Sequence, residues 1–466
     1  MNIITELSNK ITTHMSTCME EALEEGTGLT GMIESTLELV REMGRDMIEE
    51  MISTAEESVL ESDERKSAWV VQSRHREKTV STLLGDIFYR RTYYRNRVSG
   101  EFKYITDDLL GLEPHARMDT GLQADMLAKA NEISYEKVIR SYNDINISSR
   151  STVKNLIHKT SMENTNWPNM EAEKRKVRFL YVEADEDHVH QQRGKGLIMK
   201  LAYVHEGKRI MNPASRSKHK RKELIGAKYI TGLYPKNEDF WFEILDYLDT
   251  QYDLDHVEQI FLSGDGAPWI QAGTDILPNC KYVIDGYHLS KYIKSATSSY
   301  RDYEPRLKKY VYGGMKDFVE AYFETIESNK HTEAELERFA ACRTYILGNW
   351  DSIQNRNRKG YVECSAEGHI SHVLSHRLSS RPLSWSKKGS ETVAKLRVYT
   401  RNGGSIRGLL DTAKERTMKD KVQLTLDSKT LKKKRRIYDE FSSNITILDM
   451  GKRTNMFKFL KALRSA

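Results

Sequence analysis

Two short apolar runs in the middle of the chain each end in an acid that is followed by glycine. The run at 260–262 (Ile-Phe-Leu) precedes Asp265, and the run at 282–284 (Tyr-Val-Ile) precedes Asp285. A few apolar residues closed by turn residues are typical of a buried parallel strand. In open α/β sheets, ligands and catalytic residues lie beyond the carboxyl ends of such strands. Burying two acids at that position is costly, so a purely structural core would not place them there. The pattern predicts a functional site within residues 256–289.

Further strands are expected upstream of this stretch. The apolar segment 177–185 ends in Asp185, and segments 196–207 and 208–216 are interpreted as antiparallel strands. Residues 238–252 have the spacing of an amphipathic helix. Three strands, a helix, a strand, a helix and a strand, in that order, match the ribonuclease H-like fold. The predicted fold class is α/β.

A helix with a carboxylate on its apolar face is predicted over residues 364–381. Ile370, Leu374 and Leu378 share one face, and Glu367 continues that stripe one turn earlier. A carboxylate that faces a sheet needs a cation or a dense set of hydrogen bonds. The alternative is an ordinary first-turn glutamate that the helix dipole favours.

The first 62 residues are predicted to be helical and acidic. Apolar residues recur there at near-heptad spacing with charges between them. They are Ile33, Leu37, Val40, Met47 and Met51. Such a stripe more often packs against another helix than binds a cofactor. We interpret residues 1–62 as an interaction or self-association arm.

Aromatic and basic residues alternate in the next module, residues 63–115. Four arginines between positions 90 and 97 lie beside tyrosines, and Ser99-Gly100 is expected to form a hairpin turn. These arginines could grip a phosphate backbone. A half-buried hairpin with an exposed basic face explains the same pattern.

A helix-turn-helix DNA-binding domain is predicted within residues 116–165. Segments 134–142 and 148–160 are expected to be helices joined by a polar connection. The outward face of the second helix would suit a recognition helix in a major groove. Its DNA-binding candidates are Arg150, Thr152, Lys154 and Asn155. Helix pairs of this length also serve purely structural roles.

The rest of the chain divides by composition. Residues 290–360 lack strand signals and are predicted to be a helical insertion. The catalytic core is expected to combine the segments on either side of it, 176–289 and 361–400. Residues 401–466 are expected to be a basic helical region that includes the run Lys432–Arg436.

Charge and composition narrow the class of partner. Residues 1–64 hold 16 acidic and 3 basic side chains, about −13, so a net charge of +6 leaves about +19 on the other 402 residues. A basic body indicates a polyanionic partner such as DNA. The four cysteines form no CxxC pair, no stretch is apolar enough to span a membrane, and the N-terminus does not resemble a signal peptide. A cytoplasmic, nucleoid-associated protein without a membrane partner is expected.

Asp185, Asp265 and Glu367 are expected to converge from two strand ends and one helix. Three carboxylates without a nearby histidine or cysteine ligand set favour Mg²⁺ or Mn²⁺. Two such ions can activate a water or a 3′-hydroxyl and stabilise the leaving oxygen of a phosphodiester. The predicted chemistry is therefore metal-dependent phosphoryl transfer.

The first and third acids of this set have competitors. Asp187 and Glu183 share a strand face with Asp185, which is preferred because the apolar strand stops there. Glu363 competes with Glu367, but it lies before the predicted helix cap and off the apolar stripe.

Four segments resemble the signature blocks of bacterial ISLre-type insertion-sequence transposases, which are related to Mutator-like DDE transposases. They are YVEADEDHV (181–189), FLSGDGAPWI (261–270), YVIDGYHLSKYI (282–293) and AEGHISHVLSHRLSSRPLSWSKKG (366–389). The resemblance covers essentially the whole chain, and the last block is its most specific part. It implies DNA transposition by a ribonuclease H-like catalytic core with an all-helical insertion, preceded by helical and helix-turn-helix N-terminal modules. The implied partners are double-stranded DNA and further copies of the chain in a homo-oligomer on DNA.

By that resemblance, Asp185, Asp265 and Glu367 match the DDE triad. Asp285 and His288 match a Cys/Asp-x-x-His element, with aspartate where many relatives have cysteine. His288 is interpreted as a group that positions the substrate or contacts the metal ligands. The alternative is a structural histidine whose hydrogen bonds are made within the fold. Further residues of the last block that would line the same region are His369, Arg377 and Arg381.

Three functions are consistent with these features. The leading interpretation is a DNA transposase that hydrolyses and joins strands at insertion-sequence ends. A metal-dependent nuclease of the same fold and a non-catalytic DNA-binding regulator derived from a transposase are the alternatives. Three desolvated acids argue against the regulator, because a retired active site has no reason to retain them.

Overall fold

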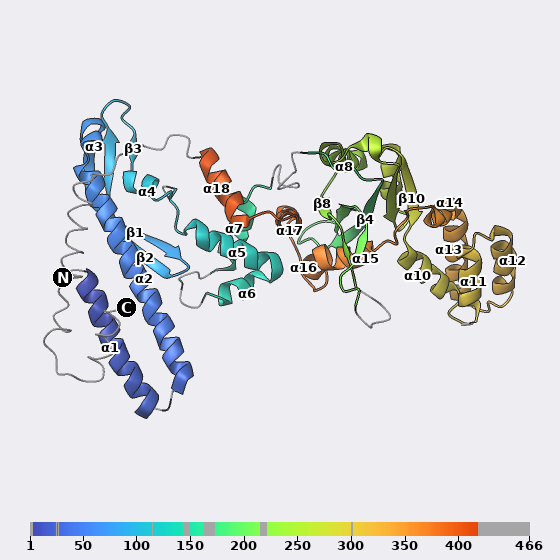
Figure 1. Ribbon diagram of the computed structural model, residues 1–466, viewed down its shortest axis with the longest axis horizontal. Helices are drawn as coiled ribbons and strands as arrows, with labels where there is room; N and C mark the ends of the chain where they lie inside the picture. The colour runs from blue at the N-terminus through green and yellow to red at the C-terminus, as the bar shows by residue number, and fades with distance from the viewer. Residues whose placement is uncertain are drawn as a thin grey trace. The chain divides into compact units, whose positions relative to one another are not determined.

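The chain folds into two compact units (Figure 1). The computed structural model describes residues 3–24, 26, 28–113, 115–142, 145, 149–162, 173–214, 221–299 and 302–417. Unit 1 contains the described parts of Met1–Met126, Glu136–Arg150 and Leu410–Ala466, and unit 2 those of Leu127–Tyr135 and Ser151–Leu409. No helix in the described part of the chain has both the length and the apolar character needed to cross a bilayer.

Unit 1 begins with two long helices that lie side by side (Figure 1). They are α1 (Ile3–Glu24) and α2 (Gly28–Glu61), so the helical prediction for this region is confirmed. Lys10 of α1 contacts Glu42 and Asp46 of α2, each at 2.6 Å. The predicted apolar stripe of α2 is not covered by α1, because its five side chains are between 43 and 57% exposed. A self-association role for this stripe stays a prediction.

A three-stranded antiparallel sheet follows the helices of unit 1. Its strands and flanking helices are α3 (Asp63–Ala68), β1 (Trp69–Thr82), β2 (Gly85–Asn96), β3 (Phe102–Lys103) and α4 (Ile105–Leu109). The turn expected at Ser99-Gly100 is confirmed, since it joins β2 to β3, and Gly100 has the left-handed φ of 71° that glycine adopts without strain.

A buried carboxylate organises one face of this sheet. Asp107 is 1% exposed and accepts hydrogen bonds from Lys78 (3.0 Å), Tyr89 (2.7 Å) and Arg91. Arg90 instead pairs at the surface with Glu77. Two of the arginines predicted to be available for DNA are therefore already engaged with acids of the same unit.

Three helices occupy the region predicted to be a helix-turn-helix. They are α5 (Thr120–Glu132), α6 (Tyr135–Arg140) and α7 (Arg150–Lys159). Val153, Leu156 and Ile157 of α7 are buried. The remaining face of α7 carries the polar residues, as the spacing of apolar positions predicts.

Unit 2 is built on a five-stranded mixed sheet of order β10-β9-β4-β5-β8. The strands are β4 (Phe179–Val189), β5 (Leu197–His205), β8 (Lys228–Gly232), β9 (Gln259–Gly264) and β10 (Cys280–Ile284). Strand β5 runs antiparallel to β4 and β8, whereas β4, β9 and β10 are parallel. The carboxyl ends of β4 and β9 therefore lie at the same edge of the sheet.

The prediction of the third strand at 208–216 was wrong. Its first residues form the short strand β6 (Lys208–Ile210), which pairs with β7 (Lys222–Leu224) in a separate two-stranded sheet. The third strand of the main sheet is β8, which begins twenty residues later. Local apolar content did not distinguish the two, because strand membership depends on which segment pairs with β5.

The two faces of the main sheet pack against different partners. Leu180, Val182 and Ala184 of β4 join the large apolar core with helix α8 (Asn237–Gln251). Tyr181 lies on the opposite face with Phe261, against the chain segment that leads to α15. Because side chains alternate along a strand, the odd-numbered acids of β4 project toward that second face.

The remaining helices of unit 2 follow the strands. Those after β9 and β10 are α9 (Pro268–Gln271), α10 (Gly286–Ala296), α11 (Tyr303–Tyr312), α12 (Lys316–Glu327), α13 (Glu333–Gly348) and α14 (Trp350–Gln354). Those near the C-terminus are α15 (Ala366–Ile370), α16 (His376–Leu378) and α17 (Lys387–Arg401). Helix α18 (Ile406–Thr417) is divided between the units, because its residues from Leu410 onward belong to unit 1. The described part of 290–360 is helical and contains no strand, as predicted. Lys432–Arg436 lie outside the described residues.

Close packing between β9 and α8 generates a stability prediction. A Cβ added to Gly273 would lie 2.8 Å from Leu262 and from Trp241. We expect Gly273→Ala to lower the free energy of unfolding by about 1–3 kcal/mol, since overpacking a core forces its neighbours to shift. Urea unfolding of the full chain measures this change.

Gly348 supplies the matched control. It lies at the end of α13, and a Cβ added there would meet no atom within 4 Å apart from its chain neighbours and the backbone of its own helix. Gly348→Ala should leave stability unchanged or raise it by up to about 1 kcal/mol. Equal stability of the two variants would contradict the packing described for Gly273.

Candidate active site

Asp185 lies within β4 and is half-buried. The strand does not stop at Asp185, where the sequence predicted its end, because pairing with β5 continues it to Val189. Asp185 Oδ1 accepts a hydrogen bond from the backbone N–H of Glu186 at 2.8 Å. Burial, together with the charges of Asp265 and Glu367, raises the pKa of the Asp185 carboxyl to about 7, because these effects outweigh the hydrogen bond from Glu186 N–H and the charge of His288. The charge of Asp185 is thus costly unless a cation or a proton compensates it.

Asp265 follows β9 in a tightly held turn. Its Oδ1 accepts from Ala267 N–H at 2.8 Å, and its carbonyl oxygen accepts from the Tyr345 hydroxyl at 2.6 Å. The next residue, Gly266, has a φ of 105° and donates its N–H to the hydroxyl of Tyr282 at 2.8 Å. The glycine after the acid is explained by this backbone conformation, which other residues rarely adopt.

Glu367 lies in the first turn of α15, two residues after the N-cap residue Ser365. Ile370, Leu374 and Leu378 are buried, so the apolar part of the predicted stripe is confirmed. The Glu367 side chain is 45% exposed, so it is not the desolvated carboxylate that the stripe predicted. The helix is not uniformly α-helical, because Ser371–Ser375 form a π-helical segment between α15 and α16. Glu363 lies outside the stripe, with an exposed side chain whose carboxylate faces Arg356 at 3.9 Å.

Asp285 and His288 form a linked pair at the start of α10. Asp285 caps the helix by accepting from Tyr287 N–H at 3.1 Å. Its other oxygen lies 3.1 Å from His288 Nδ1, and His288 Nε2 lies 4.0 Å from Glu367. The hydrogen bond with Asp285 raises the pKa of His288, and the charges of Asp185 and Asp265 add to this. The acids around His288 therefore favour its protonated form.

The three predicted acids and His288 share one electrostatic environment, although the acids do not form a ready ligand shell. With the side chains as they stand, no three His, Cys, Asp or Glu residues in the described ranges are close enough to hold a metal ion. The donor chemistry still fits a hard divalent cation, because partly desolvated carboxylates act on one another there without sulfur ligands. Asp185, Asp265 and Glu367 are the residues that would hold it.

The competing acids of β4 have other partners. Asp187 is 7% exposed, and its Oδ1 accepts from Ser375 (3.0 Å) and Ser379 (2.7 Å). Its Oδ2 has no hydrogen-bond partner among the described residues. Asp187 thus joins β4 to the end of the helix that begins at Ala366.

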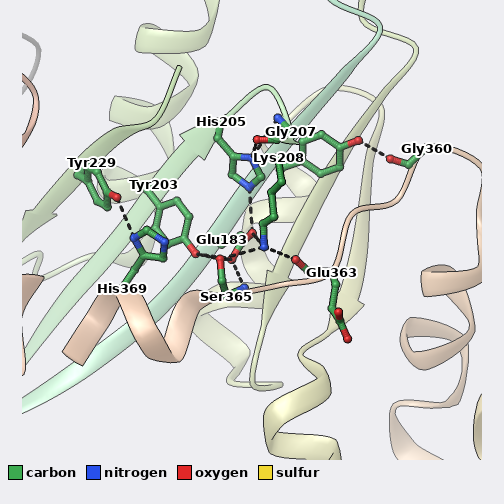
Figure 2. Close-up of polar contacts among 11 residues, drawn as sticks. Glu183, Tyr203, His205, Gly207, Lys208, Tyr229, Gly360, Glu363, Ser365 and His369 are labelled. Carbon is green, nitrogen blue, oxygen red and sulfur yellow. Dashed lines mark hydrogen bonds and ion pairs between the residues drawn. The ribbon is translucent and has the colours of Figure 1, made fainter. Parts of the chain in front are cut away.

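Glu183 belongs to a polar network that the sequence did not reveal (Figure 2). It is 1% exposed and contacts Tyr203, His205, Lys208 and Ser365. Burial raises the pKa of Glu183, but the hydrogen bond and charge of His205 and the charge of Lys208 outweigh it and bring the pKa to about 2. A glutamate in the middle of an apolar run was the one available signal of this network.

The remaining candidates of the last block lie in three different environments. His369 accepts or donates a hydrogen bond with the hydroxyl of Tyr229 at 2.8 Å, and burial lowers its pKa to about 4 (Figure 2). Arg377 is 4% exposed, donates to Ala130 O at 3.0 Å and lies over the Trp385 ring. Arg381 is exposed. Packing occupies Arg377, which leaves Arg381 as the accessible cation.

The predicted DNA-binding residues lie on one helix. Arg150, Lys154 and Asn155 of α7 are exposed, and Thr152 is half-buried. Arg150 Nε lies 3.5 Å from Glu136, but its side chain is 73% exposed. The polar face of α7 is therefore accessible to a ligand.

Fold and site together define a mixed α/β protein with carboxylates gathered at one end of a five-stranded sheet. A family model described as an uncharacterised protein family, UPF0236, matches residues 22–415. The chain belongs to the UPF0236 family.

Relatives from two organisms align with most of the chain. A UPF0236 protein of Caldanaerobacter subterraneus subsp. tengcongensis, whose name joins eleven locus designations, is 34% identical over 100% of this chain and 98% of its own. A second protein of that organism, whose name joins four, is 34% identical over 96% of this chain and 94% of its own. A UPF0236 protein in the vanSb 3′ region of Streptococcus gallolyticus is 26% identical over 73% of this chain and 76% of its own.

The serine contacts of Asp187 generate a second stability prediction. Replacing both Ser375 and Ser379 by alanine should lower the free energy of unfolding by about 2–4 kcal/mol, because each lost donor to a buried carboxylate costs about 1–3 kcal/mol. Chemical denaturation of the full chain checks the change. Ser380→Ala removes an exposed hydroxyl of the same segment and should change stability by less than about 0.5 kcal/mol. A double variant as stable as Ser380→Ala would mean that Asp187 does not depend on these serines.

Proposed function

We propose that this chain is a DDE-type DNA transposase that uses Mg²⁺ or Mn²⁺ to cleave and join DNA strands at insertion-sequence ends. The observation that carries the proposal is the placement of Asp185 on β4 and of Asp265 directly after the adjacent parallel strand β9, with Glu367 4.0 Å from His288. The three acids come from β4, from the turn after β9 and from α15, which are far apart in sequence. Like-charged groups of this kind are costly to gather unless a cation is bound in function.

The topology of unit 2 supports a ribonuclease H-like core. Three strands linked by antiparallel pairing are followed by α8 and two parallel strands, and the first strand lies at the centre of the sheet. This arrangement places the end of β9 beside Glu183 in the middle of β4, and α15 contacts the same strand. The long helical segment after β10 fits the insertion that the family resemblance implies.

The chain's own residues supply binding and orientation. When bound, divalent ions would lower the pKa of a water or 3′-hydroxyl and neutralise charge on the phosphodiester. Asp185, Asp265 and Glu367 would hold them. His288, positioned by Asp285, would direct a positive charge toward the phosphate, and the polar face of α7 would bind the DNA backbone and base edges.

The relatives' names add independent support. Two of them join several loci of one bacterium under a single protein name, eleven in one case and four in the other. Near-identical proteins encoded at many loci are expected of a gene that is copied with a mobile element. The proposal extends this interpretation to the present chain.

One assay separates the transposase from the alternatives. Purified full-length protein is mixed with the DNA that flanks its gene, including any terminal inverted repeats, with and without Mg²⁺ or Mn²⁺. Joined strands support the transposase, whereas cleavage without joining indicates a nuclease of the same fold. A metal-independent mobility shift without cleavage indicates a DNA-binding regulator and would overturn the proposal.

Removing one carboxylate should abolish strand cleavage and leave DNA binding intact. We expect Asp265→Asn and Glu367→Gln each to lower the cleavage rate by roughly 10³-fold, because losing several kcal/mol of charge stabilisation costs about tenfold for each 1.36 kcal/mol. DNA affinity should stay within about twofold. Glu363→Gln is the control, since Glu363 is an exposed acid a few residues from Glu367. Full activity of Asp265→Asn or Glu367→Gln would exclude that residue from the site.

Substitutions on α7 should have the opposite effect. Arg150→Ala and Lys154→Ala are expected to weaken binding to the DNA ends, and each lost phosphate contact should reduce the salt dependence of binding by about one unit of slope. Fluorescence anisotropy at several salt concentrations measures both quantities. Lys316→Ala, which removes an exposed lysine of α12, is the charge-matched control. Unchanged affinity in both α7 variants would show that α7 is not the recognition helix.

A further inference from the structure

We infer that Glu183 is the positioning residue that fixes Glu367 relative to Asp185. The inference rests on the proposed function, because it assigns a purpose to the spacing of two proposed metal ligands. It begins from the placement of Glu183 on β4, two residues before Asp185 and on the same face of the strand. The Glu183 side chain, which faces α15, therefore projects from the same strand that carries Asp185.

A direct hydrogen bond joins the two ligand-bearing segments. Glu183 Oε2 accepts from the backbone N–H of Ser365 at 2.5 Å and lies 3.3 Å from the Ser365 hydroxyl (Figure 2). Ser365 is the N-terminal cap residue of α15, and Glu367 follows in the first turn. Because Glu183 binds the residue that caps the helix, it sets where the turn that carries Glu367 begins.

The other partners hold the Glu183 carboxylate in place. The hydroxyl of Tyr203 donates to Oε2, and His205 Nε2 lies 2.9 Å from Oε1. Both come from β5, which is paired with β4 along its length. Glu183 therefore cannot rotate away from Ser365 without losing hydrogen bonds to the neighbouring strand.

Lys208 completes the network next to the chain segment that leads into α15. Its Nζ lies 3.7 Å from Glu183 Oε1, donates to the Ser365 hydroxyl at 3.0 Å and donates to the carbonyl oxygen of Glu363 (Figure 2). The segment just before α15 is thus fixed at two backbone positions, the Glu363 carbonyl and the Ser365 N–H. A buried acid that only stabilised the fold would not need to bind the backbone of this particular segment.

Metal binding tests the inference separately from catalysis. Binding of Mn²⁺ to the full-length protein is followed by the loss of the free-ion signal in electron paramagnetic resonance, and strand cleavage and DNA affinity are measured in parallel. Glu183→Gln should weaken Mn²⁺ binding by roughly tenfold and lower kcat for cleavage by at least the same factor. The Kd for DNA ends should remain within about twofold. Glutamine keeps the shape of the side chain but presents an amide that cannot accept from all of the donors.

Two further variants separate positioning from stability. Tyr203→Phe removes one donor to the oxygen that also binds Ser365, and it should reduce kcat by about threefold to tenfold in a protein that remains folded. If Glu183→Gln does not fold, Tyr203→Phe tests the inference in its place. Gly273→Ala, which destabilises unit 2 without touching the network, should leave both kcat and Mn²⁺ binding unchanged below its unfolding temperature. If Gly273→Ala lowers kcat as much as the network variants, Glu183 is only a stabilising residue and the inference is overturned.

The outcomes distinguish this inference from the proposed function. If wild-type protein binds Mn²⁺, Asp265→Asn loses the ion, and both Glu183→Gln and Tyr203→Phe keep wild-type binding and kcat, then the inference fails and the proposed site stands. If wild-type protein and Asp265→Asn bind Mn²⁺ equally weakly and neither cleaves DNA, the proposed function itself fails.

Discussion

The cost of burying carboxylates on β4 is the constraint on which the charged face of unit 2 depends. Glu183, Asp185 and Asp187 alternate along one face of this strand, yet each has a different environment. Glu183 is surrounded by donors from β5, β6 and the segment before α15, and Asp187 is bound by two serines. Asp185, between them, is left close to other acids. The two flanking acids thus bind the helix segment at both of its ends and hold it over the middle one.

This arrangement depends on the position of β4 within the sheet. Because β4 lies at the centre, it is hydrogen-bonded to β5 on one side and to β9 on the other. Strand β5 contributes the partners of Glu183, and β9 brings Asp265 to the same edge. The central strand is therefore the one place from which a side chain can reach an antiparallel neighbour, a parallel neighbour and the covering helix at once.

Ion pairs also neutralise charge within unit 1, where a basic surface was expected. Asp107 is buried against Lys78 and Arg91, so part of the positive charge of the hairpin is neutralised inside the unit. A buried ion pair of this kind contributes little net stability, but removing one partner leaves an uncompensated charge. The acidic helices α1 and α2 instead expose their apolar stripe. Unit 1 therefore neutralises part of its positive charge internally and leaves the apolar stripe of α2 exposed.

Much of the local structure follows from the sequence alone. The apolar runs of β9 and β10, each closed by an acid and glycine, predicted both strands, and the spacing of Ile370, Leu374 and Leu378 predicted the buried face of the helix that carries Glu367. These features are set by residues a few positions apart, so periodicity detects them. The resemblance to a transposase family supplied the remaining site assignments, which stay predictions.

Only the tertiary structure decided the features that depend on distant pairing. Strand β8, not segment 208–216, completes the sheet because it is the segment that pairs with β5. The contact between Glu183 and Ser365 joins residues that are 182 positions apart. The sequence by itself determined the elements with a clear local pattern, such as β9, β10 and the apolar face of the helix that carries Glu367. The choice among three acids on one strand required the fold, because it depends on donors that folding brings from elsewhere in the chain.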